Sequence, residues 1–202
     1  MKKLFLIVLF VSTTIYSQNV HESDSYENDN FTVKIRQVKG DLNKDGLKDS
    51  VEVNMDTISK TRPLRLQIFF AQSSGKPELV VSSTKIIEAQ YPIRLEGKHS
   101  GNTIPDFYIE KGNLIMESYI NDKSRHTFKF RNGNFELIHF SKINWDGKET
   151  TTQTKFNLLT GNYIEEYQML GSDEIFEKNK KIITIKPLPK IQDFIPFQTE
   201  IY

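Results

Sequence analysis

The sequence predicts a mainly β fold, an antiparallel meander or sandwich of short hairpins with little helix. Apolar and polar residues alternate in many short runs, which is the period of a half-buried strand. Turns rich in glycine and asparagine separate these runs, as they do between sequential hairpins. Helical periodicity over ten or more residues is nearly absent, and its best candidate, Ser172–Lys181, is weak.

The expected strands follow one another from residue 31 onward. They are Phe31–Val38, Val51–Val53, Leu64–Phe70, Leu79–Val81, Phe107–Ile109, Leu114–Ile120, Thr127–Arg131, Phe135–Ile143, Thr152–Leu158, Tyr163–Tyr167 and Ile182–Ile185. The strongest turn signal is Asn132-Gly133, the preferred pair for a type I′ turn. Lys111-Gly112-Asn113 and Thr160-Gly161-Asn162 also suit tight turns, because glycine and asparagine tolerate positive φ.

Residues 1–17 are expected to be a secretory signal peptide, which predicts a secreted or periplasmic protein. Lys2 and Lys3 precede the apolar run Leu4–Val11, and Ser17 is the small residue before the expected cleavage site. That run is shorter than the roughly 18–20 residues of a membrane span, and no other window approaches this length. The alternative is a buried N-terminal helix or strand. With no cysteine in the chain, neither a lipid anchor on cysteine nor a disulfide is expected.

The rest of the chain divides into three parts by composition. Residues 18–30 are polar and acidic, as expected of a flexible leader that cannot bury enough surface to fold. Residues 31–186 are expected to form one β-rich domain. Residues 187–202 combine prolines with phenylalanines, so we expect an extended tail that packs aromatic rings without pairing as a central strand. The formal charge of +1, with both signs interspersed, argues against a nucleic-acid partner.

The acidic loop at residues 41–52 is the most informative motif. Oxygen-bearing residues alternate around Gly46, which suits calcium, a hard cation that takes several oxygen ligands. Counted from Asp41, the calcium-loop spacing is satisfied by Asp41, Asn43, Asp45, the carbonyl of Leu47 and Asp49, while Glu52 falls at position twelve. Whether Glu52 contacts the ion stays open. The alternative is a solvated turn without an ion, because turns favour Asp, Asn and Gly.

The alternating flanks of this loop predict strands on both sides, unlike the helices of an EF-hand. Gly-Asp-Leu-Asn-Lys-Asp-Gly-Leu-Lys-Asp (residues 40–49) resembles the signature of FG-GAP/VCBS-type repeats, in which strand, calcium loop and strand follow one another. The resemblance implies calcium ligands at Asp41, Asn43, Asp45, the Leu47 carbonyl and Asp49. The motif occurs once, so the repeated blades of a propeller are not expected. The order of parts, including Arg62-Pro63-Leu64 and Phe156–Gly161, is similar to a group of exported bacterial proteins.

Two histidines form a second, weaker candidate metal site. A two-residue turn at Asn132-Gly133 would place Phe130 opposite Phe135 and His126 opposite His139. Two imidazoles across a hairpin could hold zinc or copper if a third ligand completed the site. The alternative is that both histidines lie at the end of an aromatic core stripe. No Gly-x-Ser-x-Gly motif or other catalytic signature stands out.

The sequence therefore favours an exported, non-catalytic β-domain with a structural calcium ion, which binds a protein or other macromolecule. One alternative is a secreted hydrolase acting on cell-wall or polysaccharide material, and another is a carrier of a small apolar ligand. A binding domain should expose aromatic or apolar side chains, for instance around Trp145. A hydrolase should show a cleft with converging titratable groups, and a carrier an enclosed apolar cavity.

Overall fold

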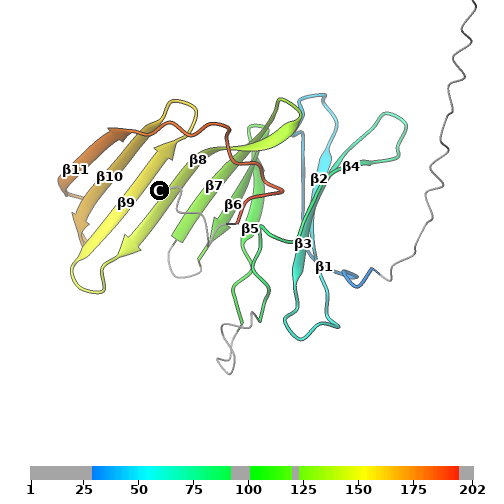
Figure 1. The fold of residues 1–202 in the computed structure, drawn as a ribbon, viewed down its shortest axis with the longest axis horizontal. Helices are drawn as coiled ribbons and strands as arrows, with labels where there is room; N and C mark the ends of the chain where they lie inside the picture. Colours follow the sequence, from blue (N-terminus) through cyan, green and yellow to red (C-terminus); the bar gives the residue numbers. More distant parts are fainter. Residues whose placement is uncertain (1–28, 92–100, 120–122, 196–202) are drawn as a thin grey trace, which may run out of the picture.

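The computed structural model describes residues 29–91, 101–119 and 123–195 (Figure 1). These residues form eleven strands in two antiparallel sheets and no helix, which confirms the predicted mainly β class. None of the described residues belongs to a helix long and apolar enough to cross a membrane. The expected signal peptide, residues 1–17, and residues 18–28 of the expected leader lie outside the described residues.

The smaller sheet has four strands in sequence order. They are β1 (Val33–Gly40), β2 (Asp49–Met55), β3 (Leu64–Phe70) and β4 (Glu78–Ser83). Alternation turns one face of each strand inward, so that Val51, Leu66 and Ile68 are fully buried. The opposite face carries polar groups such as Glu52 and Gln67.

The larger sheet has seven strands that also pair in sequence order, which makes a long meander. They are β5 (Asp106–Glu110), β6 (Asn113–Ser118), β7 (Lys123–Arg131), β8 (Asn134–Trp145), β9 (Thr150–Asn157), β10 (Asn162–Met169) and β11 (Ile175–Ile182). The hairpin predicted at Asn132-Gly133 is confirmed, because both residues have positive φ, 51° and 72°, and Phe130 pairs with Phe135.

One hydrophobic core joins the two sheets. The ring of Phe70 on β3 meets that of Phe130 on β7 edge to face, with centroids 4.9 Å apart. The sheets also approach at β1 and β5, where a Cβ on Gly40 would lie 2.9 Å from the side chain of Ile109. A residue larger than glycine at position 40 would therefore push the sheets apart at this edge.

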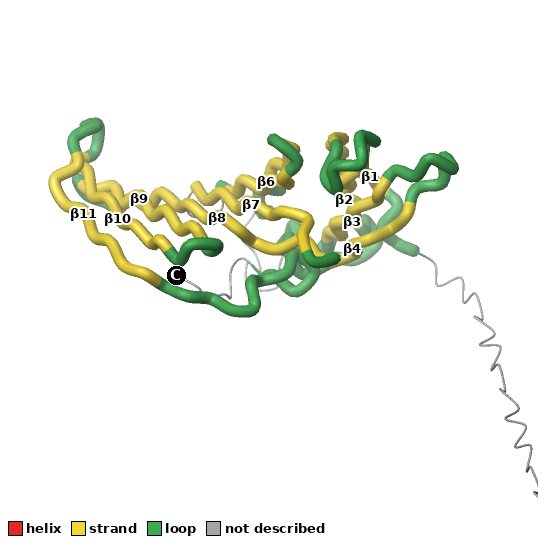
Figure 2. The backbone as a smooth tube through the Cα atoms, turned by 90° about the horizontal axis from the view of Figure 1, so that it is seen from above, coloured by secondary structure: helices red, strands yellow, loops and turns green. Residues whose placement is uncertain are grey.

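The segment after β11 covers part of the larger sheet, and Figure 2 shows it passing across one face from β11 back toward the smaller sheet. Two hydrogen bonds attach it to β8: the Leu137 N–H donates to the Pro189 carbonyl at 2.8 Å, and the Ile191 N–H donates to the Phe135 carbonyl at 2.9 Å. Phe194 then packs edge to face on the core, 5.6 Å from Phe128. Residues 196–202 lie outside the described part.

Two expectations about the last third of the chain were wrong. Ser172–Lys181 does not contain a helix, because residues 175–182 form β11 and pair with β10 along its length. Cross-strand contacts account for this: the Lys178 ammonium donates to the Glu166 carboxylate, and Lys181 lies 4.2 Å over the Tyr163 ring. Of the strand expected at Ile182–Ile185, only Ile182 belongs to a strand.

Candidate functional site

The acidic loop connects β1 and β2, so it is flanked by strands. Gly40 and Asp49 form the last pair of the ladder on either side of the loop. Within the loop, Lys44 and Gly46 have positive φ, 68° and 86°. These two left-handed residues fold the chain tightly, and Gly46 adopts its angle at no steric cost because it has no Cβ.

Three of the expected ligands hold the loop in this shape. Asp41 accepts the backbone N–H groups of the third and fifth residues after it, at 2.6 and 3.0 Å. Asn43 and Asp45 each accept the N–H of the second residue after them, at 3.1 and 2.7 Å. The Asn43 amide also donates to Asp45, at 2.9 Å. The oxygens of these side chains are therefore ordered by backbone donors.

The donor set has the chemistry that a hard cation requires. An ionised carboxylate offers about four acceptor sites, and the hydrogen bonds use two of these on Asp41 and two on Asp45. Carboxylate, amide and backbone carbonyl oxygens are the groups that bind calcium. In the part of the chain that the structure describes, no three His, Cys, Asp or Glu side chains converge as metal ligands.

Asp49 differs from the other expected ligands because its carboxylate is fully buried. One oxygen accepts the Leu42 N–H at 2.7 Å, and the other accepts the Ala71 N–H, just after β3, at 3.0 Å. Asp49 thereby ties the loop to the end of the neighbouring strand. Sequence reasoning missed this role, because both donors come from loops whose positions depend on the tertiary fold.

Glu52 lies on the outer face of the smaller sheet, among donors from β1 and β2. Its carboxylate accepts the Lys34 ammonium at 2.8 Å and the Gln37 amide at 2.6 Å. Partial burial by itself would raise the pKa of Glu52, but the hydrogen bonds and charge of Lys34, with help from Ser50 and Gln37, lower it below its ordinary value. These hydrogen bonds of Glu52 therefore link β1 to β2.

The two histidines do not face each other. The register shifts after Thr127, so that His126 pairs with Phe140 and Thr127 pairs with His139. This bulge places His126 in the core and His139 on the exposed face, because one extra residue reverses the side-chain direction. The predicted His126–His139 juxtaposition is therefore wrong, and the pair cannot share a metal ion across the hairpin.

His126 is instead an isolated polar group among aromatic rings. Its ring lies 5.0 Å from that of Phe140 and 5.1 Å from that of Phe194. Its Nδ1 has no hydrogen-bond partner among the described residues. Desolvation by burial lowers the pKa of His126 to about 4, because the cationic form cannot be hydrated there.

A groove of about 420 Å³ lies on the outer face of the smaller sheet, beside the acidic loop. Its walls include Lys39, Lys48, Glu52 and Phe69. Glu52 is the one carboxylate among its lining residues. Glycoside hydrolysis requires two carboxylates flanking the bond, so this groove does not offer the pair that such a reaction needs.

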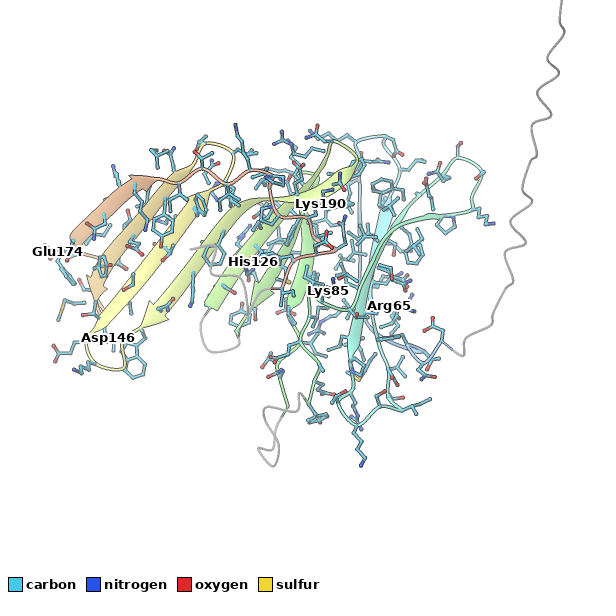
Figure 3. All side chains as sticks on the ribbon, in the orientation of Figure 1. Arg65, Lys85, His126, Asp146, Glu174 and Lys190 are labelled. Carbon is cyan, nitrogen blue, oxygen red and sulfur yellow. The ribbon has the colours of Figure 1, made fainter. Side chains whose placement is uncertain are left out.

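Exposed apolar side chains gather at the far end of the larger sheet, which we call the distal group (Ile143, Trp145, Met169 and Leu170). Trp145 is 58% exposed and Leu170 is 57% exposed. Trp145 pairs with Thr151, Met169 pairs with Thr150, and the Leu170 N–H donates to the Glu149 carbonyl, so these residues lie near the β8–β9 turn. Because Thr150 and Thr151 are neighbours in β9, Trp145 and Ile143 lie on one face of the sheet and Met169 lies on the other. In Figure 3, Asp146 marks this turn, far from Arg65 on the smaller sheet.

Comparison of the chain with protein-family models, curated proteins and solved structures gave no match.

Proposed function

We propose that the protein is an exported β-domain that binds a protein or other macromolecule without catalysis and carries a structural calcium ion. Within the distal group, Ile143 and Trp145 support the binding role, because these two exposed apolar side chains lie on one face of β8 and exposed apolar patches often mark interaction sites. Trp145 is also the chain's one tryptophan, and tryptophan is enriched among the residues that dominate binding energy. Export is supported by the lysine pair and apolar run at the start of the chain.

The proposed calcium site uses side-chain oxygens of Asp41, Asn43 and Asp45 with the Leu47 carbonyl. The ordered loop supports this, because backbone donors already fix the three side chains. Asp49 completes the set implied by the resemblance, and it would bind through lone pairs not used by its two N–H donors. An extracellular site of this kind binds at roughly 10⁻⁴–10⁻³ M and acts as a permanent part of the fold.

Thermal unfolding tests the calcium proposal. We expect millimolar calcium to raise the melting temperature of the wild-type protein above its value in chelator. Asp45→Ala should melt in calcium at the temperature that the wild type shows in chelator. Lys44→Ala, in the same exposed loop, is the matched control and should keep the calcium effect. A wild-type melting curve that chelator leaves unmoved would refute the structural ion.

Fluorescence of Trp145 tests the binding proposal, because it is the chain's one tryptophan and the emission of each added protein, recorded alone, can be subtracted. Titration with proteins from the cell envelope of the source cell should shift the emission, whereas soluble cell-wall oligosaccharides should not. Trp145→Ser should weaken the affinity for the bound protein at least tenfold. A shift with oligosaccharides alone would favour the polysaccharide alternative, and hydrolysis of them would contradict the non-catalytic role.

The packing of the core gives less support to the alternative that the protein carries a small apolar ligand. The side chains of Phe128, Phe135 and Phe156 are fully buried. Their neighbours are other rings at contact distance, such as Tyr163 at 5.6 Å from Phe156. The phenylalanine-rich strands therefore fill the space between them with their own rings.

A further inference from the structure

The last strand of the larger sheet, β11, is an open edge. Among the described residues it pairs with β10 alone, and all eight of its residues are exposed. Its outward N–H and C=O groups are therefore available to another strand, and such an edge is a ready template for pairing. The Ile183 N–H donates to the Gly161 carbonyl, so by alternation Glu177, Asn179 and Lys181 point their backbone groups toward β10, and Lys178, Lys180 and Ile182 point theirs outward. A β-bulge at Phe176 ends this alternation.

Of the devices that normally protect an edge, β11 has a β-bulge at Phe176, but residues 177–182 beyond it pair with β10 in regular register. The strand contains no proline. Lysines often blunt edges, but the Lys178 ammonium is held by Glu166 and Lys181 lies over the Tyr163 ring. Two of the three lysines are thus turned along the sheet and partly neutralised. Phe176 and Ile182, near the two ends of the strand, are 55% and 70% exposed.

We propose that β11 pairs antiparallel with β11 of a second copy of this chain, about a two-fold axis at Asn179. Directly opposite residues in an antiparallel pair lie on the same face, so only every second register is allowed. Centring on Asn179 places Glu177 opposite the partner's Lys181, and the symmetry makes this ion pair twice. The five residues paired in this register, 177–181, all lie beyond the bulge at Phe176.

The neighbouring registers lack this complementarity. Centring on Lys178 would place two lysines on the axis and Glu177 opposite Asn179, so that the ion pair is lost. Centring on Glu177 would place two carboxylates on the axis. The Asn179 register does bring Lys178 opposite Lys180, but the Glu166 carboxylate beside Lys178 offsets that repulsion. Charge therefore selects one register for self-pairing. This interface uses neither the calcium loop nor the distal group, so it does not rest on the proposed function.

Charge exchange tests the interface. The wild-type protein should dimerise in sedimentation experiments, whereas Glu177→Lys and Lys181→Glu should each weaken dimerisation at least tenfold, since each places like charges opposite one another. An equimolar mixture of the two variants should form mixed dimers, detected by native mass spectrometry, because one chain then carries two lysines and the other two glutamates at these positions, so that both ion pairs can form. The double variant Glu177→Lys/Lys181→Glu should dimerise with itself.

A backbone block provides a second, independent test. Lys180→Pro removes an outward N–H that the pairing requires, and edge strands tolerate proline. Lys180→Ala is the matched control and should dimerise at least as well as the wild type. A wild-type protein that stays monomeric up to about 1 mM would overturn the proposal. A dimer that survives both single charge changes, or a mixture that fails to form mixed dimers, would also overturn it.

Discussion

The seven-stranded sheet is one meander, but its inner strands (β5–β8) and its outer strands (β9–β11) are stabilised by different interactions. On the inner strands, Phe128, Phe135 and Leu137 are buried beneath the smaller sheet and the C-terminal segment. On the outer strands, this burial continues only at Phe156 and Tyr163, near the β9–β10 turn. Farther along these strands polar contacts hold the ladder together: Lys155 and Lys178 both reach Glu166. The difference suggests that the inner part is the scaffold and that the outer part is the surface offered to partners.

The largest expected effect lies on the inner strands. Phe128→Ala should lower the free energy of unfolding by about 3–5 kcal/mol, because it removes a fully buried ring and leaves a cavity. Trp145→Ala, on the outer part, should change it by no more than about 0.5 kcal/mol. Urea denaturation of both variants measures the contrast. Equal losses would mean that the outer part is also a packed core.

Acid should weaken the inner part through His126. Its pKa is about 4 in the folded state, against an ordinary value of 6.5, so the unfolded state binds more protons between these values. Stability should therefore fall as the pH drops from about 6.5 toward 4, by about 3 kcal/mol for this group.

His126→Phe keeps an aromatic ring beside Phe140 and Phe194 and removes the titration. Its unfolding free energy, measured by urea denaturation across this range, should depend less on pH than that of the wild type. An unchanged pH dependence would show that another group is responsible.

Asp49 should matter for the scaffold whether or not calcium is present. Asp49→Ala leaves the buried N–H groups of Leu42 and Ala71 without their acceptor, which should cost about 2–3 kcal/mol. Chemical denaturation in chelator measures this loss free of any contribution from the ion. Asp45→Ala, compared in the same buffer, should lose less than about 1 kcal/mol, because its two hydrogen bonds are exposed. A large loss for Asp45→Ala in chelator would mean that the loop needs this carboxylate without a metal.

The smallest effect is expected on the outer strands. Glu166→Gln should lower stability by less than about 1 kcal/mol at neutral pH, because the two lysines that it binds are largely exposed. Hydrogen bonds from Lys155 and Lys178 lower the pKa of Glu166 to about 2 from an ordinary 4.5. The contribution is therefore present above pH 4.5 and is lost as the pH falls toward 2. Urea denaturation of the wild type and of Glu166→Gln at low and high salt measures this contribution. A stability difference that salt leaves unchanged would contradict an ionic origin.

Local sequence signals predicted the elements that depend on local chemistry. Alternation located most strands, and Asn132-Gly133 gave the hairpin and its first pairs. The same reasoning failed at the bulge next to Phe128, because no residue type there indicates that β8 contains an extra residue between Leu137 and His139. It failed at β11, where contacts with Glu166 and Tyr163 outweigh a weak helical pattern. The placement of Asp49 depends on the end of β3, 22 residues away from Asp49, and no local signal carries that information.

Hydrogen exchange in calcium and in chelator tests the account most directly, because it reads the loop and the outer strands in one experiment. We predict that calcium slows amide exchange in residues 41–55 and leaves residues 162–182 unchanged. Equal exchange in residues 41–48 with and without calcium would contradict a structural ion in this loop. Slower exchange confined to β10 and β11 would contradict the division between scaffold and binding surface.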